Sequence, residues 1–169
     1  MSISMHQATV PPLLRAVGNL SSILEKASAH GESRGIDPQV LLQSRLYPDM
    51  FPLVRQVQIA SDLTRRGTAR LAGVDAPPLA DTETSFPELI HRLQTTIAYL
   101  ESFKPEQIDG TEDKEFTVPV GGGHSITMRG WPFLSYFLLP NVFFHVTTAY
   151  AILRHNGVEL GKRDFLGQP

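Results

Sequence analysis

One histidine of this chain stands where it could do chemistry. His145 lies in a long apolar segment and Asn141 precedes it by four residues, so on a helix both side chains extend from the same face. That spacing allows two helical side chains to share a metal ion or a substrate. The structural alternative is a core histidine hydrogen-bonded to an amide, and the sequence leaves both interpretations open.

A second group of polar residues lies in the segment from about Asp49 to Ala72. Gln58 and Asp62 are four residues apart, and Arg55 precedes Gln58 by three. Gln58 adjoins an apolar stripe, so its side chain could turn inward, while Asp62 could hold Arg55 or Arg66. The alternative is an exposed polar helix face.

The other histidines and the acidic residues of the linkers are predicted to lie on the surface. Four more histidines fall at helix ends, off an apolar stripe or beside a turn: His30, His91, His124 and His155. The acidic pairs in the linkers, such as Asp81 and Glu83, are likewise expected to be solvated. The sequence has no cysteine and no G-x-S-x-G or H-E-x-x-H motif, which excludes disulfides, thiolate chemistry and those catalytic arrangements.

Four apolar stripes with helical spacing predict the elements that position these residues. The predicted helices are Ser4–His30, about Asp49–Ala72 with Asp49 as N-cap, Ser85 to about Lys104, and roughly Gly130–Asn156 interrupted at Pro140. Alternating residues around Gly121-Gly122-Gly123 predict a β-hairpin over 115–129. The sequence therefore predicts an all-α four-helix bundle with a short β-hairpin before the last helix, one domain over 1–169 with an irregular tail from about 158.

The net charge, the N-terminal sequence and the apolar stretches limit the partners and the cellular location that can be expected. The net charge is −2 with a pI of about 6.3, so no basic field is available for nucleic acid. No signal peptide is evident at the N-terminus, which favours a cytoplasmic protein. The stretch Trp131–Leu153 has no charged residue and is long enough to span a bilayer, but its two prolines and its polar residues favour a buried bundle helix and no membrane association. Because this segment is apolar nearly all round, we expect a homodimer.

Three stretches carry a resemblance to a known family. They are Ser44–Leu53 (SRLYPDMFPL), Gln56–Asp62 (QVQIASD) and Pro140–Tyr150 (PNVFFHVTTAY), the last continuing to Gly157. Together they resemble an uncharacterised, domain-of-unknown-function branch of the DinB/YfiT-like superfamily. The resemblance extends over almost the whole chain.

The resemblance implies a four-helix bundle, frequent dimers and a divalent-metal site with one histidine on the second helix and two on the fourth. Some members are transferases or isomerases that act with a low-molecular-weight thiol. In this chain the ligand places fall on Gln58, Asn141 and His145, with Asp49 and Asp62 as possible oxygen ligands. Neutral amides are weak ligands for transition metals, so we expect a weakly bound divalent metal or none.

These observations lead to two functional hypotheses. The first is a degenerate metal-dependent transferase or hydrolase that binds a small molecule between the second and fourth helices. His145 would be its general base or lone metal ligand, and Gln58, Asn141, Asp49, Arg55 and Asp62 would line the pocket. The second is a non-catalytic dimeric module for ligand binding or stress response.

Overall fold

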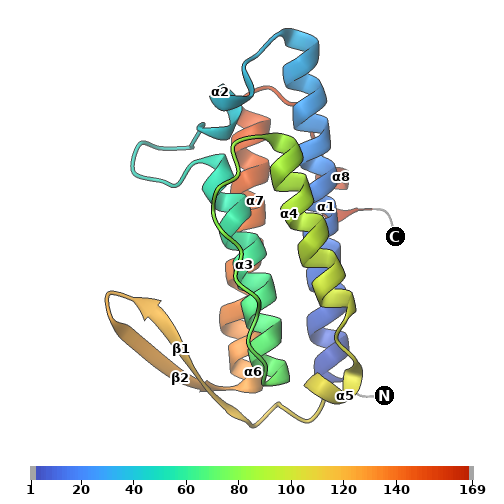
Figure 1. Ribbon diagram of the computed structural model, residues 1–169, viewed down its shortest axis with the longest axis vertical. Coiled ribbons are helices and arrows are strands. Elements are labelled where there is room, and N and C mark those ends of the chain that lie inside the picture. Colours follow the sequence, from blue (N-terminus) through green and yellow to red (C-terminus); the bar gives the residue numbers. More distant parts are fainter. Residues whose placement is uncertain (1–2, 168–169) are drawn as a thin grey trace.

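A computed structural model describes residues 3–167 as four long helices, several helical turns and one hairpin (Figure 1). The long helices are α1 (Met5–Arg34), α3 (Leu53–Ala72), α4 (Phe86–Glu101) and α7 (Leu139–His155). The short elements are α2 (Pro38–Leu42), α5 (Pro105–Ile108), α6 (Gly130–Pro132), the π-helix η1 (Phe133–Leu138) and α8 (Lys162–Leu166). The predicted all-α bundle with a hairpin before its last helix is confirmed.

The chain order of the bundle requires one long connection. After α3 ends, the chain returns along the side of that helix, and α4 then begins near the end at which α3 began (Figure 1). We call this returning segment, residues 73–85, the crossover. It makes α3 and α4 run in the same direction, whereas α1 and α7 run oppositely. An irregular segment of this length must be fastened to the helices that it passes, because its own backbone supplies no regular hydrogen bonds.

The core is formed by the inner stripes of the four long helices. α3 packs against α7 and α4, and α1 packs against α4 and α7. Gly67 of α3 lies directly against Leu138: a Cβ at this glycine would be 2.4 Å from the Leu138 Cδ1. Gly67 therefore permits the close approach of α3 and η1.

The start of α3 differs from the prediction. Asp49 is exposed in a turn before the helix, where the Met50 N–H donates to the Tyr47 carbonyl at 3.0 Å. Pro52 is the N-cap, and no side chain caps this end. Asp49 is therefore not the N-cap, because the turn separates it from the first helical residue by four positions.

The last helical segment is interrupted where the sequence indicated. Pro140 has no N–H with which to close a helical turn. Immediately before it, the Leu139 N–H donates to the Leu134 carbonyl, a bond across five residues that belongs to the π-helix η1. Wider turns of this kind often occur at functional sites, and η1 faces α3.

The hairpin pairs β1 (Glu115–Gly121) with β2 (His124–Arg129) and projects from one end of the bundle (Figure 1). Phe116 and Val118 of β1 are buried, whereas most of β2 is exposed. The predicted hairpin is confirmed, and its inner strand forms a wall beside α3.

The tail from residue 158 was predicted to be irregular, but the structure shows a short helix in it. It contains α8, which lies against α1 through a 2.5 Å ion pair between Lys26 and Asp164 and a bond from the Asn19 amide to the Phe165 carbonyl. Five residues are too few to show a helical period, so the sequence pattern could not reveal this helix.

Within residues 3–167, the segment Gly130–His155 is the one helical stretch long and apolar enough to cross a membrane, and 39% of its apolar part is buried in the bundle. Core helices of soluble proteins have the same composition. Here the stretch supplies one of the four packed helices.

Candidate functional site

The imidazole of His145 is held by a glutamine of α3. The His145 Nδ1 lies 2.7 Å from the Gln56 Oε1, and the Gln56 Nε2 donates to the Phe51 carbonyl at 3.0 Å. Because the amide nitrogen is used as a donor towards Phe51, the amide oxygen is the acceptor that faces the imidazole. Nδ1 therefore carries the hydrogen, and in the neutral ring Nε2 keeps its lone pair.

The surroundings of His145 favour that neutral ring. Burial lowers the pKa of His145 below its ordinary value of 6.5, and the positive charge of Arg55 lowers it further. Phe144 stands edge-on to the imidazole, with ring centroids 5.2 Å apart. The ring can thus accept a proton or a hydrogen bond through Nε2, which is the chemistry that the sequence proposed for it.

The other two predicted ligand residues have different partners. Gln58 donates to the Glu83 Oε2 at 2.9 Å and accepts from Arg55 at 3.3 Å. Asn141 donates to the Phe137 carbonyl at 2.6 Å. The structure therefore pairs His145 with Gln56, a residue that sequence reasoning missed, and it turns Gln58 towards the crossover.

The different partners of Gln56 and Gln58 have a geometric reason. Gln56 and Gln58 are two positions apart, which on an α-helix corresponds to a rotation of about 200°. Both side chains are buried, at 2% and 5% exposure, because α7 covers one and the crossover covers the other. The sequence did contain a signal for Gln56: Leu53 and Val57 lie on the inner stripe of α3, and Gln56 lies beside them, next to the core.

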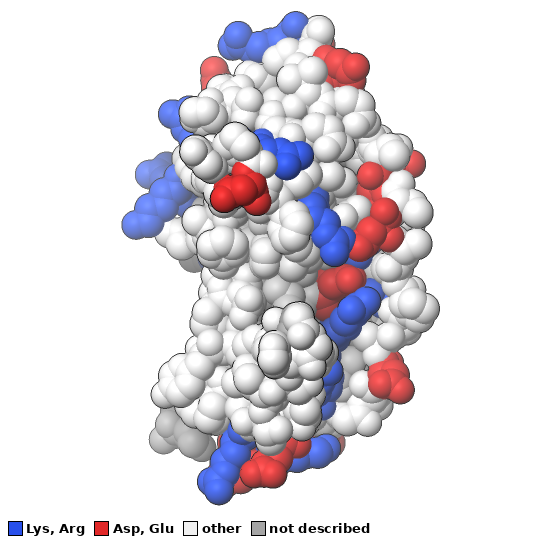
Figure 2. Space-filling model, turned by 90° about the vertical axis from the view of Figure 1, so that its left-hand side faces the viewer, with Lys and Arg blue, Asp and Glu red and all other residues white. Residues whose placement is uncertain are grey.

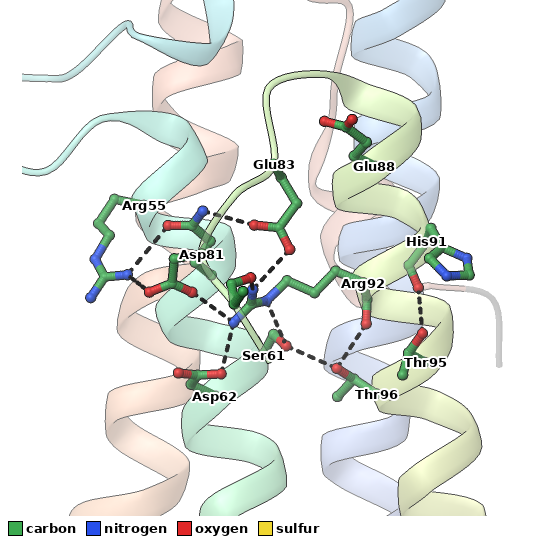
Figure 3. A network of polar contacts seen from close by, with 12 residues as sticks. Arg55, Ser61, Asp62, Asp81, Glu83, Glu88, His91, Arg92, Thr95 and Thr96 are labelled. Atoms are coloured by element: carbon green, nitrogen blue, oxygen red, sulfur yellow. Dashed lines mark hydrogen bonds and ion pairs between the residues drawn. The ribbon is translucent and has the colours of Figure 1, made fainter. Parts of the chain in front are cut away.

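A second polar cluster is centred on Arg92 of α4 (Figure 3). Its guanidinium, 1% exposed, binds the carboxylates of Asp62 at 2.7 Å, Glu83 at 2.8 Å and Asp81 at 3.0 Å. It also donates to the Ala80 carbonyl and the Ser61 hydroxyl. Burial alone would lower the pKa of Arg92, but the hydrogen bond and charge of Glu83 and the charges of Asp62 and Asp81 raise it.

This cluster fastens the crossover to the bundle. Arg92 and Gln58 bind Glu83, Arg55 binds Asp81, and Arg65 donates to the carbonyl of Pro77. Asp81 and Glu83 were expected to be solvated linker residues. Asp81 is exposed, as expected, but Glu83 is half-buried, and both bind arginines because the crossover brings them back over α3 and α4.

A groove of about 300 Å³ runs along the outer side of α3. Its α3 wall consists of residues that share one helix face: Arg55, Ile59, Asp62, Leu63, Arg66, Gly67 and Arg70. Its opposite wall is apolar and comes from β1 and η1: Val118, Pro119, Phe133, Phe137 and Leu138. Figure 2 faces the side from which the hairpin projects and shows a hollow there with charged side chains beside it. The groove thus includes Arg55 and Asp62 from the predicted pocket set; Gln58, Asn141, His145 and Asp49 are outside its lining.

The lower part of the groove has excess positive charge. The Asp62 carboxylate is shared by Arg92 at 2.7 Å, Arg66 at 3.3 Å and Arg65 at 3.8 Å, so it balances only part of the charge of Arg66. Within the part of the chain that the structure describes, Arg70 makes no hydrogen bond or ion pair. A half-buried arginine without a partner is a group that an anion could satisfy.

The donor groups do not fit the resident metal site that the DinB-like resemblance implies. Over residues 3–167 there is no group of three or more His, Asp or Glu side chains arranged to hold an ion. His145 supplies one imidazole nitrogen, while the amides of Gln58 and Asn141 are used in the hydrogen bonds above. One imidazole is a poor match for zinc or iron, which bind through several nitrogen or sulfur ligands.

The chain is similar to known proteins in sequence and in fold. A family model described as "Domain of unknown function (DUF1993)" matches residues 5–166, and the chain belongs to this family. The chain is similar, at 41% identity, to a crystal structure of a DinB family member protein from Shewanella denitrificans, with a TM-score of 0.90 over 97% of this chain and 92% of that one. No curated protein matches the chain. The resemblance found in the sequence is thereby confirmed.

Proposed function

We propose that this DUF1993 family member is a cytoplasmic small-molecule-binding protein whose ligand lies in the groove along α3. The supporting observation is the groove itself, in which a charged wall of α3 faces an apolar wall of β1 and η1. Its volume of about 300 Å³ is at the lower end of the range for small-molecule sites. It lies between α3 and η1, and of the residues that the sequence proposed for a pocket it includes Arg55 and Asp62.

The proposal needs no metal ion. A weak divalent site at His145 stays a prediction, because its Nε2 is one nitrogen donor with an available lone pair. If the protein is an enzyme, the same nitrogen is the general base. His145 is outside the groove lining, but the charge of Arg55, which lines the groove, lowers the pKa of His145.

Backbone NMR of the ¹⁵N-labelled protein during titration with 1-octanol, a neutral amphiphile, tests groove binding. We expect saturable shifts concentrated in α3, η1 and β1. Ile59 is half-buried and lines the groove, so Ile59→Trp should fill it and abolish the shifts. Ile90 of α4 is also half-buried but lies outside the groove lining, and Ile90→Trp should leave them in place. Shifts that survive Ile59→Trp, or that occur on other elements, would contradict the proposal.

A homodimer is the second part of the proposal, favoured by an apolar surface on the last helical segment. Tyr136, Phe143 and Phe144 are 77%, 37% and 57% exposed, and no charged side chain interrupts 131–153. Exposed aromatic residues on one segment are typical of subunit interfaces. The non-catalytic dimeric module remains compatible with ligand binding in the groove.

Light scattering of wild-type protein and of Tyr136→Glu tests the interface. We expect a dimer for the wild type and a monomer for the variant, because a carboxylate cannot be buried unpaired at the contact. Thr95→Glu, at an exposed position of α4, is the matched control and should remain dimeric. A monomeric wild type would disprove this part of the proposal.

A further inference from the structure

We infer that the groove takes an organic monoanion with an apolar body, such as a medium-chain carboxylate, and that Arg66 and Arg70 bind its carboxylate. The inference rests on the proposed function and specifies the ligand of the same groove. Three features of the described residues support it: the placement of the two arginines, the apolar wall opposite them, and the negative groups that limit the charge of the ligand.

Arg66 and Arg70 are four residues apart on α3, so their side chains leave the same helix face about one turn apart. Both line the groove and the adjoining hollow formed with Gly73, Val74 and Asp75. Arg66 has a single carboxylate partner that it shares, and Arg70 has none among residues 3–167. Two neighbouring guanidiniums can each donate to one carboxylate group, which accepts through two oxygens.

The groove wall opposite the arginines is apolar, which favours a ligand with an apolar body. Phe133 and Leu138 are buried in the bundle yet line the groove, and Phe137 is half-buried beside them. Because Phe133 and Leu138 are each only 1% exposed, the carbon surface open to a ligand comes mainly from half-buried Phe137 and exposed Pro119. A ligand that consists only of a charged group would leave this carbon surface in water, whereas an alkyl or aryl body would cover it and gain about 25 cal/mol for each Å² buried.

The negative groups nearby favour a single charge over two. Asp62 lies in the groove and Asp75 lines the adjoining hollow, so two carboxylates lie beside Arg66 and Arg70 and offset part of their positive charge. Arg70 is also in the last turn of α3, where the helix dipole repels anions. A phosphate dianion would meet both sources of repulsion and would lack the helix N-terminus that often binds phosphate. A carboxylate carries half the negative charge of a phosphate dianion, so it is repelled less.

Calorimetric titration with sodium octanoate, beside the NMR titration with neutral 1-octanol, tests this inference. Octanoate should bind the wild type more tightly than octanol, and its affinity should fall as NaCl is raised. Arg70→Gln should weaken octanoate about tenfold to a hundredfold, the effect of one charge-assisted hydrogen bond, and leave octanol unchanged. Arg154→Gln is the matched control, because Arg154 is also in the last turn of a long helix but lies outside the groove lining.

The outcomes separate the two proposals. If octanol binds in the groove and octanoate binds no more tightly, or if Arg70→Gln leaves octanoate affinity unchanged, the anion inference is wrong and groove binding stands. If neither ligand shifts groove residues, both are wrong. Circular dichroism of Arg70→Gln shows whether the variant is folded, and Arg66→Gln provides a second, exposed substitution for which the same weakening is expected.

Discussion

The side-chain oxygen of Gln56 accepts a hydrogen bond from the Nδ1 of His145 at 2.7 Å, and this contact joins α3 to α7 across the bundle. It fixes which imidazole nitrogen carries the hydrogen. It also leaves Nε2 as the atom through which any proton transfer or metal binding at His145 would take place.

Gln56→Leu should remove the hydrogen bond that fixes the tautomer of His145. The buried Nδ1–H would lose its acceptor, and we expect a loss of about 1–3 kcal/mol in the free energy of unfolding. Long-range ¹H–¹⁵N NMR of the imidazole should show Nδ1 protonated in the wild type at neutral pH and a mixture of tautomers in the variant. A wild-type ring protonated at Nε2 would contradict the assigned geometry.

The lowered pKa of His145 makes stability depend on pH. Its pKa is near 6.5 in the unfolded chain and lower in the folded protein, so the unfolded chain binds the proton first as the pH falls. This contribution to stability is complete above about pH 6.5 and is lost between that value and the folded pKa. His145→Asn keeps a side-chain nitrogen as donor but does not titrate, so its urea-derived stability should fall less from about pH 7.5 to 5.5 than that of the wild type. Equal slopes would show that His145 is not buried as a neutral ring.

Arg92 should be among the most sensitive positions of the protein. Arg92→Met leaves the carboxylates of Asp62, Asp81 and Glu83 without their shared cation, and we expect a loss of about 3–5 kcal/mol. The crossover should then become an early site of limited proteolysis. Arg66→Gln is the control: the Arg66 side chain is 64% exposed, so its ion pair with Asp62 should be worth at most about 1 kcal/mol. A crossover as resistant in Arg92→Met as in the wild type would show that Arg92 does not hold it.

Gly67 and Leu138 should be coupled. Gly67→Ala gains about 1 kcal/mol of helix propensity, but its Cβ collides with Leu138 and should cost about 1–3 kcal/mol. We therefore expect Gly67→Ala to destabilise the wild type and to stabilise a Leu138→Ala background, in which space is available. A double-mutant cycle from chemical denaturation measures this coupling. Additive effects would mean that the two helices do not meet at this point.

The helices and the hairpin could be predicted from the sequence because their signals are local. Apolar spacing along α1, α3, α4 and α7 and the glycines at 121–123 each reflect the conformation of neighbouring residues. The interruption before Pro140 follows from the missing N–H of proline. The early start assigned to α3 was wrong because the turn at 47–50 contains residues that also suit a helix cap.

The candidate site could be predicted only in part, because its partners are distant in the sequence. The sequence identified His145 as a residue of interest, but it does not show how α3 is rotated against α7, so it could not reveal that Gln56 is the hydrogen-bond partner of His145. The role of Asp81 and Glu83 depends on the crossover returning along α3, and an irregular segment has no periodicity from which its path could be read. The groove is likewise formed by three elements, and only one of its walls shows as a stripe in the sequence.

The most direct test is a crystal structure of the protein soaked with 8-bromooctanoate, with the bromine located by its anomalous signal. The account predicts a bromine peak in the groove against Phe133, Phe137 or Leu138, and a carboxylate within hydrogen-bonding distance of Arg66 and Arg70. A bromine peak that lies only outside this groove, or a groove that stays empty at saturating ligand, would contradict it.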